Sequence, residues 1–336
     1  MTSPELLQSL LALIVAAMLS AATTWAIRPM LVRHALAKPN ARSSHRIPTP
    51  QGAGIAVIAA TLVVAGVVIG GATGLKLPLA VFAASLFIAA VGFADDVKSI
   101  DVLPRLILQA VAVGVIVFTA SSDLRIVPAC PLGIERAILL LAGLWFVNLV
   151  NFMDGLDWMT VAEAVPVTGA MVILGWLGEI PVSTTIVAAA LCGAMTGFAP
   201  FNRPVAKVFL GDVGSLPIGL LLGWCLLQLA YQQQFAAALL LPLYYLLDAT
   251  TTLLRRLARR EPFWAAHRSH FYQRATDNGF TVWRVVGEVF ALNIALAALA
   301  LGSIAAPSAG IKALLLAAGA IACALVMYRF SQPRSS

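Results

Sequence analysis

Long, uninterrupted apolar runs constrain this chain more than any other feature, because a helix needs about 20 apolar residues to cross the hydrocarbon core of a bilayer. Eleven runs approach or exceed that length, and they predict spans near residues 5–27, 53–72, 77–94, 104–120, 135–152, 159–178, 181–199, 213–231, 235–254, 284–304 and 308–329. The runs are continuous instead of alternating with polar residues, which indicates helices. The sequence therefore predicts an all-α, polytopic integral membrane bundle.

The composition leaves hardly any room for a soluble domain. Of the 336 residues, 60% are hydrophobic and 11% are charged, whereas about a quarter of a typical soluble domain is charged. We therefore expect one transmembrane domain over residues 1–336, with its chemistry in the loops between spans.

The basic residues divide unequally between the two sides that these spans define. Of the 22 Lys and Arg residues, 18 fall on the side that follows the first span, and four fall on the other side (Lys76, Arg125, Arg136 and Lys312). Loops rich in Lys and Arg stay in the cytoplasm. The asymmetry predicts an odd number of spans, an N-terminus outside and a C-terminus in the cytoplasm.

Polar residues gather in five predicted cytoplasmic segments, near residues 28–53, 94–104, 150–158, 200–213 and 255–283. Three carry carboxylates at the ends of apolar runs: "GFADDVKSID" with Asp95 and Asp96, "NLVNFMDGLDWM" with Asn151, Asp154 and Asp157, and "KVFLGDVGSLPIG" with Asp212. The other two are basic: "KPNARSSHRIPTPQGAG" with His45, and "RRLARREPFWAAHRSHFYQRATDNG" with His267, Arg268 and His270.

Asp95 and Asp96 close an apolar run at its C-terminal end. The helix dipole disfavours anions at that end, so helix capping does not explain the pair. Burial beside lipid is costly for a carboxylate. We therefore expect a cation next to them, with Lys98 as one candidate.

Each segment alone has an ordinary structural explanation: a cap for Asp212, a turn around Gly155, and topology or lipid contact for the basic run. Together, three carboxylate clusters on one membrane face favour a shared role. Oxygen ligands of this kind suit Mg²⁺, which proteins hold through one or two carboxylates plus substrate phosphates. The sequence therefore predicts a cytoplasmic, metal-assisted phosphoryl-transfer site.

The five segments, in this order, resemble the polyprenyl-phosphate N-acetylhexosamine-1-phosphate transferase family. "FADDVKSID" looks like its aspartate-rich motif, "NFMDGLDWM" like its NxxDGxDGL-type motif, "VFLGDVGS" like its (F/M)GDxGS motif and "HRSHFYQR" like its histidine motif, while "PNARSSHRIPTPQGAG" looks like its first loop. The resemblance covers most of the chain. It implies a multi-span bundle in the bacterial inner membrane with the active site facing the cytoplasm.

The resemblance also implies the reaction. The phosphate of undecaprenyl phosphate attacks the β-phosphate of a UDP-N-acetylhexosamine, with UDP-GlcNAc as the default donor, and UMP leaves. Such enzymes start O-antigen, capsule or other surface-polysaccharide assembly. No nucleic-acid partner is expected, and the sequence leaves the oligomeric state open, a homodimer among the alternatives.

The resemblance assigns roles to single residues. Asp212, with Asn151, is expected to bind Mg²⁺, or Mn²⁺ in its place. Asp95 is expected to act as a base or to position the acceptor phosphate, with Asp96 beside it. The remaining candidates are expected to bind substrate: Asn151, Asp154, Asp157, His267, Arg268, His270, His45 and Lys98.

Two departures bear on the choice within the family. Trp158 stands where the second Gly of the DGxDG motif is usual, and "IPTPQGAG" replaces the "GTPTMGG" of the phospho-N-acetylmuramoyl-pentapeptide translocase. That translocase is therefore the less favoured alternative within the family. A transporter would carry polar residues at mid-span, where this chain reads as apolar. A scaffold protein would leave the one-sided carboxylates unexplained.

Overall fold

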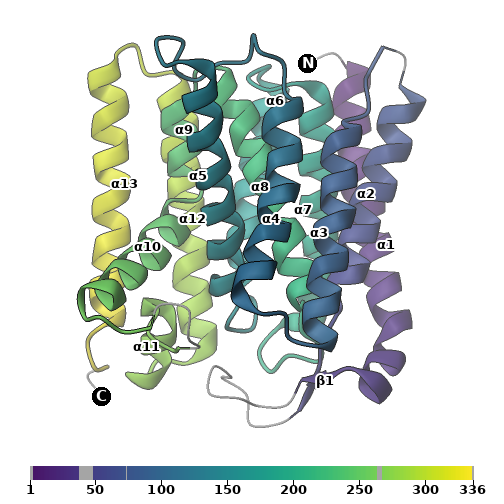
Figure 1. Ribbon diagram of the computed structural model, residues 1–336, viewed down its shortest axis with the longest axis vertical. Coiled ribbons are helices and arrows are strands. Elements are labelled where there is room, and N and C mark those ends of the chain that lie inside the picture. Colours follow the sequence, from purple (N-terminus) through teal and green to yellow (C-terminus); the bar gives the residue numbers. More distant parts are fainter. Residues whose placement is uncertain (1–2, 38–47, 73, 263–266, 335–336) are drawn as a thin grey trace.

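A bundle of long, nearly parallel and antiparallel helices makes up the computed structural model, which describes residues 3–37, 48–72, 74–262 and 267–334 (Figure 1). Within those residues, ten helices are long and apolar enough to cross a membrane. They are α1 (Ser3–His34), α2 (Gly54–Gly71), α3 (Leu79–Val97), α4 (Val102–Thr119), α5 (Leu132–Met153), α6 (Met159–Trp176), α7 (Val182–Asn202), α8 (Asp212–Tyr231), α12 (Val282–Ile304) and α13 (Ala309–Phe330).

The ninth expected span, residues 235–254, is not one continuous helix. It is divided into α9 (Phe235–Leu240) and α10 (Leu243–Ala258) at Leu241 and Pro242. A proline lacks the N–H that a continuous helix would require, so a break before α10 is expected on physical grounds. The two pieces together lead from one end of the bundle to the other, and the chain termini lie at opposite ends (Figure 1). That placement agrees with an odd number of crossings.

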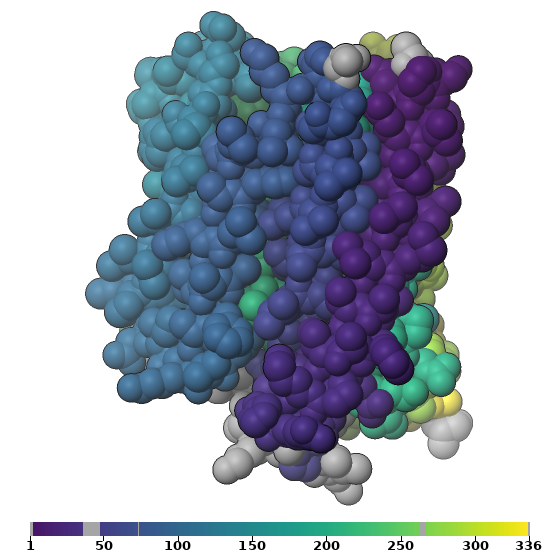
Figure 2. All heavy atoms as spheres, turned by 90° about the vertical axis from the view of Figure 1, so that its right-hand side faces the viewer, coloured from purple at the N-terminus to yellow at the C-terminus, as the bar shows by residue number. Residues whose placement is uncertain are grey.

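The centre of the bundle is made by α6, α7 and α8, which are buried along most of their length, while α1, α4 and α13 are largely exposed on its outside. Figure 2 shows one outer face, on which α1, α2, α3 and α4 stand side by side. Gly193 and Gly197 of α7 let α1 approach closely, because a Cβ at either position would lie about 2 Å from an α1 carbonyl oxygen. Small residues of this kind are typical of close helix contacts in membranes.

A short hairpin and one short helix lie at the end of the bundle where the C-terminus lies (Figure 1). The hairpin pairs β1 (Leu36–Ala37) antiparallel with β2 (Thr49–Pro50). The chain then continues beside the segment that enters α8: Phe209 donates its N–H to Pro50 O at 2.7 Å, and Gly54 donates its N–H to Leu210 O at 2.9 Å. The short helix is α11 (Phe271–Asp277).

The opposite end is tied by Arg136, which is only 5% exposed at the start of α5. Its Nη1 donates to Val117 O at 2.6 Å and to Tyr231 Oη at 3.1 Å, and its Nη2 donates to Ser121 O at 2.7 Å. These bonds satisfy carbonyls at the end of α4, where a helix leaves them without intrahelical partners. One guanidinium therefore joins α4, α5 and the last residue of α8.

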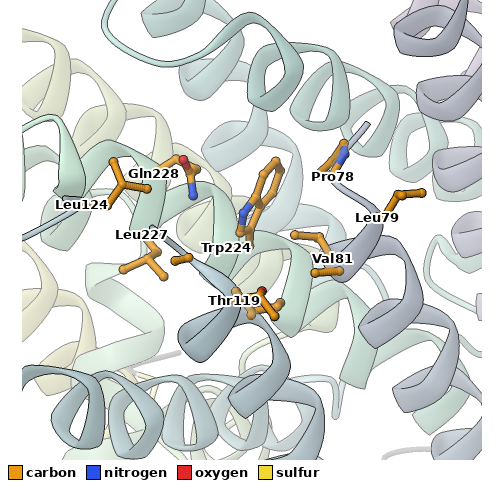
Figure 3. A pocket seen from close by; sticks show the side chains of 11 residues that line it. Pro78, Leu79, Val81, Thr119, Leu124, Trp224, Leu227 and Gln228 are labelled. Carbon is orange, nitrogen blue, oxygen red and sulfur yellow. The ribbon is translucent and has the colours of Figure 1, made fainter. Parts of the chain in front are cut away.

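A cavity of about 210 Å³ lies at this same end, between the start of α3, the end of α4 and the second half of α8 (Figure 3). Val81, Thr119, Trp224 and Gln228 are among its lining residues. Asp95 is at the other end of α3, so this cavity is separate from the polar segments.

The spans are not wholly apolar, contrary to the expectation that weighed against a transporter. Glu163 of α6 is 2% exposed and Asn293 of α12 is 1% exposed. Asn293 Nδ2 donates to Glu163 Oε2 at 2.7 Å and to Ala162 O at 2.9 Å. The hydrogen bond between the two side chains joins α6 to α12 and gives each buried polar group a partner.

Candidate active site

Asp96 accepts hydrogen bonds from the first residues of α8. Its Oδ1 accepts from the Asp212 N–H at 2.9 Å and its Oδ2 from the Val213 N–H at 3.0 Å, while Gln51 Nε2 donates to Oδ1 at 2.5 Å. The first N–H groups of a helix have no intrahelical acceptor and favour an anion. Asp96 therefore caps α8 from another helix, which explains why a carboxylate stands at the C-terminal end of α3.

Small residues allow α3, α2 and α8 to meet at this point. A Cβ at Gly92 would lie 2.2 Å from the Asp212 carbonyl oxygen, and a Cβ at Gly54 would lie 2.2 Å from Gly214 Cα. Both distances are far below contact between carbon atoms. Gly92 on α3 and Gly54 on α2 thus set how closely Asp95 and Asp96 approach Asp212.

Asp95 pairs with Arg105, near the start of α4. Arg105 Nη1 lies 2.8 Å from Asp95 Oδ2 and 4.0 Å from Asp212 Oδ2, so the guanidinium lies beside both carboxylates. The Ile100 N–H donates to Asp95 Oδ1 at 2.6 Å. Lys98, the expected cation, is instead exposed. The ion-pair partner of Asp95 is therefore Arg105, whose place in the sequence indicated only a topological charge.

Asp212 also contacts the third polar segment. Asn151 Nδ2, at the end of α5, donates to Asp212 Oδ1 at 2.8 Å and to Ser215 Oγ at 2.8 Å. Asp212, Asp95 and Asn151 therefore come together as expected. In this arrangement the amide nitrogen of Asn151 faces Asp212, so the Asn151 oxygen would bind a metal ion only after the amide turns over.

Asp154 and Asp157 occupy different environments in the loop between α5 and α6. Asp154 is half-buried and accepts a hydrogen bond from Thr160 Oγ1, and burial raises its pKa to about 6. Asp157 is 3% exposed, and its Oδ2 accepts from the Ala206 N–H at 3.0 Å. The described contact of Asp157 holds the loop before α8 in place, whereas Asp154 lies nearer to the surface.

The histidine segment lies against the same loop. Tyr272 Oη donates to Phe152 O at 3.0 Å, and a Cβ at Gly155 would lie 2.2 Å from that hydroxyl oxygen. His270 is buried, and its ring centroid lies 5.0 Å from that of His267. Arg268 Nη2 lies 3.3 Å from Asp277 Oδ1. His45 lies outside the described residues.

The described parts of all five polar segments therefore form one connected cluster. Residues 50–54 form backbone hydrogen bonds with the segment before α8, and Gln51 donates to Asp96, which caps α8. Asn151 donates to Asp212. Tyr272 donates to Phe152, the residue after Asn151. The cluster combines carboxylate oxygens with a guanidinium, which is a set of groups that binds phosphate together with a divalent cation.

Comparison with known proteins shows the family of this chain. A model of glycosyl transferase family 4 matches residues 78–230, which include Asp95, Asp154 and Asp212. A decaprenyl-phosphate N-acetylglucosaminephosphotransferase of Mycolicibacterium smegmatis is 30% identical over 304 residues, which cover 79% of this chain and 74% of that protein. The chain belongs to glycosyl transferase family 4.

Two further similar proteins match different lengths of this chain. A probable undecaprenyl-phosphate N-acetylglucosaminyl 1-phosphate transferase of Bacillus subtilis is 24% identical over 314 residues, or 85% of each chain. A phospho-N-acetylmuramoyl-pentapeptide-transferase of Enterococcus faecalis is 36% identical over 106 residues, but these cover 31% of this chain and 33% of that protein. The similarity to the N-acetylglucosamine enzymes thus extends over much more of the chain.

Trp158, where the resemblance led us to expect a glycine, has a backbone conformation that suits glycine. Trp158 has φ 64° and ψ 0°, in the left-handed region that glycine adopts most easily. Its N–H donates to Asn202 Oδ1 at 2.8 Å, and its indole Nε1 donates to Ala199 O at 2.6 Å. These bonds hold a bulky residue in an unfavourable conformation, so the turn is kept while the ring fills space beside α7.

Two polar residues of this cluster, Arg105 and Gln51, were not among the candidates from the sequence. Gln51 lies within the first polar segment but was not singled out there, and Arg105 counted only as a topological charge. Asp248 of α10, outside this cluster and within an apolar run, was missed as well. Arg105 is one residue after a proline near the start of a span, close in sequence to Asp95 and Asp96, and that proximity was the available signal. Nothing in the sequence around Asp248 pointed to a partner.

Proposed function

We propose that the chain transfers N-acetylhexosamine 1-phosphate, with N-acetylglucosamine as the sugar, from a UDP-sugar to undecaprenyl phosphate. A phosphate oxygen of the lipid forms a bond to the sugar-linked phosphorus. The bond from that phosphorus to the bridging oxygen breaks, and UMP leaves with the electron pair. The product is a lipid-linked sugar diphosphate that starts a surface polysaccharide.

The observation that carries this proposal is the convergence of Asp95, Arg105, Asn151 and Asp212 at the start of α8. Two phosphate-bearing substrates bring several negative charges together, so the reaction requires positioning and charge neutralisation more than a strong base. The lipid phosphate is already largely ionised near neutral pH, by analogy with a phosphoserine. The arrangement supplies a cation and metal-binding oxygens at one place.

The residues present suit Mg²⁺. Asp212 Oδ1 accepts from Asn151, while Asp212 Oδ2 lies 4.0 Å from Arg105, which is longer than a hydrogen bond. Mg²⁺ binds through one or two carboxylates together with substrate phosphates, and Asp212 would hold it here, joined by the Asn151 oxygen once that amide turns over. When bound, it would stabilise negative charge on the donor diphosphate, and Mn²⁺ would serve in the same way.

The other residues of the site would bind and position the two substrates. Arg105 would neutralise a phosphate between Asp95 and Asp212, and Asp95 would position the attacking lipid phosphate. Asp96 would hold the start of α8 through its two backbone contacts. Asn151 and Asp154 would face the nucleotide, and His267 and His270 the donor sugar.

The proposed setting follows from topology. Lys and Arg dominate the loops on the side of the cluster, which supports an active site on the cytoplasmic side of the bacterial inner membrane and an N-terminus outside. The lipid acceptor and the water-soluble donor would then meet at the membrane surface.

The direct test uses protein purified in detergent with undecaprenyl phosphate, Mg²⁺ and a panel of UDP-sugars. We expect UMP release and a lipid product with UDP-N-acetylglucosamine, loss of turnover with EDTA, and its return with Mg²⁺. Asp212→Asn and Asp95→Asn should abolish turnover in folded protein, while Asp101→Asn, an exposed carboxylate of the same loop, should retain it. Near-normal rates in both site variants would refute the site, and no turnover with any UDP-N-acetylhexosamine would refute the reaction.

A further inference from the structure

Asp248 of α10 is a completely buried carboxylate outside the Asp212 cluster, with no exposed surface. Groups from two helices surround it. Its Oδ1 is within hydrogen-bonding distance of Phe271 N (3.0 Å), His270 Nδ1 (3.2 Å) and Thr252 Oγ1 (3.3 Å), and its Oδ2 of Tyr244 Oη (3.1 Å) and Tyr272 N (3.3 Å). Asp248 therefore joins α10 to the start of α11.

Two backbone contacts show that both oxygens of Asp248 are hydrogen-bond acceptors. Phe271 N–H donates to one carboxylate oxygen and Tyr272 N–H donates to the other, so both oxygens act as acceptors. If His270 Nδ1 carried a lone pair, two acceptors would face each other at 3.2 Å with no proton between them. Buried polar atoms avoid such pairings because they cost free energy. The proton of a neutral His270 ring therefore lies on Nδ1.

That tautomer leaves the lone pair of the neutral ring on Nε2, on the far side of the ring from Asp248. The ring is held further by stacking: its centroid lies 5.7 Å from that of Tyr272, with 26° between the planes. Tyr272 in turn donates to Phe152 O, next to Asn151. One carboxylate thus sets the orientation of His270 and the position of α11 against the Asn151 loop.

We propose that Asp248 is a positioning residue for His270, holding its proton on Nδ1 so that Nε2 is presented to the sugar diphosphate of the donor. The proposal rests on the proposed function for the identity of the donor. Nε2 accepts a hydrogen bond from a sugar hydroxyl or amide when the ring is neutral. Asp248 itself does not touch the substrate.

The first test measures the tautomer in the wild-type protein, without any substrate. The chain has four histidines, so ¹⁵N-histidine labelling gives few signals, and the His270→Gln variant identifies that of His270. We expect the proton of neutral His270 on Nδ1. A proton on Nε2 overturns the proposal, whatever the variants do, and this readout stands even if no UDP-sugar is turned over.

The second test asks whether Asp248 acts through His270. We expect Asp248→Asn to lower kcat/KM for the UDP-sugar by about tenfold, the lower end of the loss when the orienting carboxylate behind a metal-bound histidine is removed, with KM for undecaprenyl phosphate unchanged. Tyr244→Phe is the matched control, because it removes one hydroxyl from Asp248 and leaves the His270 contact; its rate should stay within about twofold of wild type.

A double variant separates positioning from a merely structural role. If Asp248 acts through His270, Asp248→Asn adds nothing to the loss caused by His270→Gln. Additive losses in the double variant, or a normal rate for Asp248→Asn in folded protein, overturn the proposal. Failure of the wild-type protein to release UMP would instead count against the proposed function.

Discussion

The contact between Gly92 and the start of α8 makes a quantitative prediction about catalysis. In Gly92→Ala the added Cβ would lie 2.2 Å from the Asp212 carbonyl oxygen and 2.4 Å from its carbonyl carbon. Both partners are backbone atoms, so no side chain can turn aside, and α3 and α8 must separate by about 1 Å to reach ordinary contact. Overpacking of this kind costs about 1–3 kcal/mol, which leaves the protein folded.

The same displacement moves Asp95 and Asp96 away from Asp212. A misplacement of about 1 Å at a reacting centre costs on the order of 100-fold in rate. We therefore expect Gly92→Ala to release UMP about 100-fold more slowly than wild type, although no polar group has been removed. Gly114→Ala on α4 is the matched control, because its Cβ would have no neighbour closer than 3.8 Å. A Gly92→Ala rate within about threefold of Gly114→Ala would refute this geometry.

Three further predictions concern single polar groups. Arg105→Ala should remove nearly all UMP release, and Arg105→Lys should restore part of it, because a cation returns without the planar guanidinium; equal rates in the two variants would count against charge neutralisation. Asp96→Asn should lower stability by about 1–3 kcal/mol in thermal unfolding, because its NH₂ group faces an N–H of α8 and leaves that donor without an acceptor; an unchanged Tm would contradict the capping role. Burial raises the pKa of Asp154 to about 6, so its contribution to stability is full below its unfolded pKa near 3.8 and is lost as pH rises through about 6. The apparent Tm of wild type should therefore fall over that range relative to Asp154→Asn, and parallel profiles would refute the assignment.

The sequence predicted the helical bundle because length and hydropathy alone decide what crosses a bilayer. It also predicted which loops converge, since the carboxylates fall at span ends on one side. Lys98 and Arg105 show the limit: both follow Asp95 within ten residues, and only the packing of α4 against α3 decides that Arg105 makes the pair. The cap made by Asp96 joins residues 116 positions apart, so no local pattern contains it.

Hydropathy revealed neither the break in the ninth span nor the partners of Asp248. The run over residues 235–254 has the length of a span, and its hydropathy does not reveal that Pro242 divides it. Asp248 then lies on the buried face of α10, where the two backbone N–H groups that it accepts from belong to α11 and not to its own run. Hydropathy indicates only which runs can cross the membrane. The break at Pro242 is a local backbone effect that hydropathy does not measure, whereas the partners of Asp248 in α11 meet it only after folding.

The guanidinium of Arg136 restricts how three helices can tilt relative to one another. It ties α4, α5 and α8 together at one end, and the same three helices carry Arg105, Asn151 and Asp212 at their other ends. A helix of 20 residues such as α8 is a lever about 30 Å long, so a tilt of about 2° about the tied end moves its far tip by about 1 Å. The contacts of Arg136 on one side of the membrane thus help to set the spacing of Arg105, Asn151 and Asp212 on the other side.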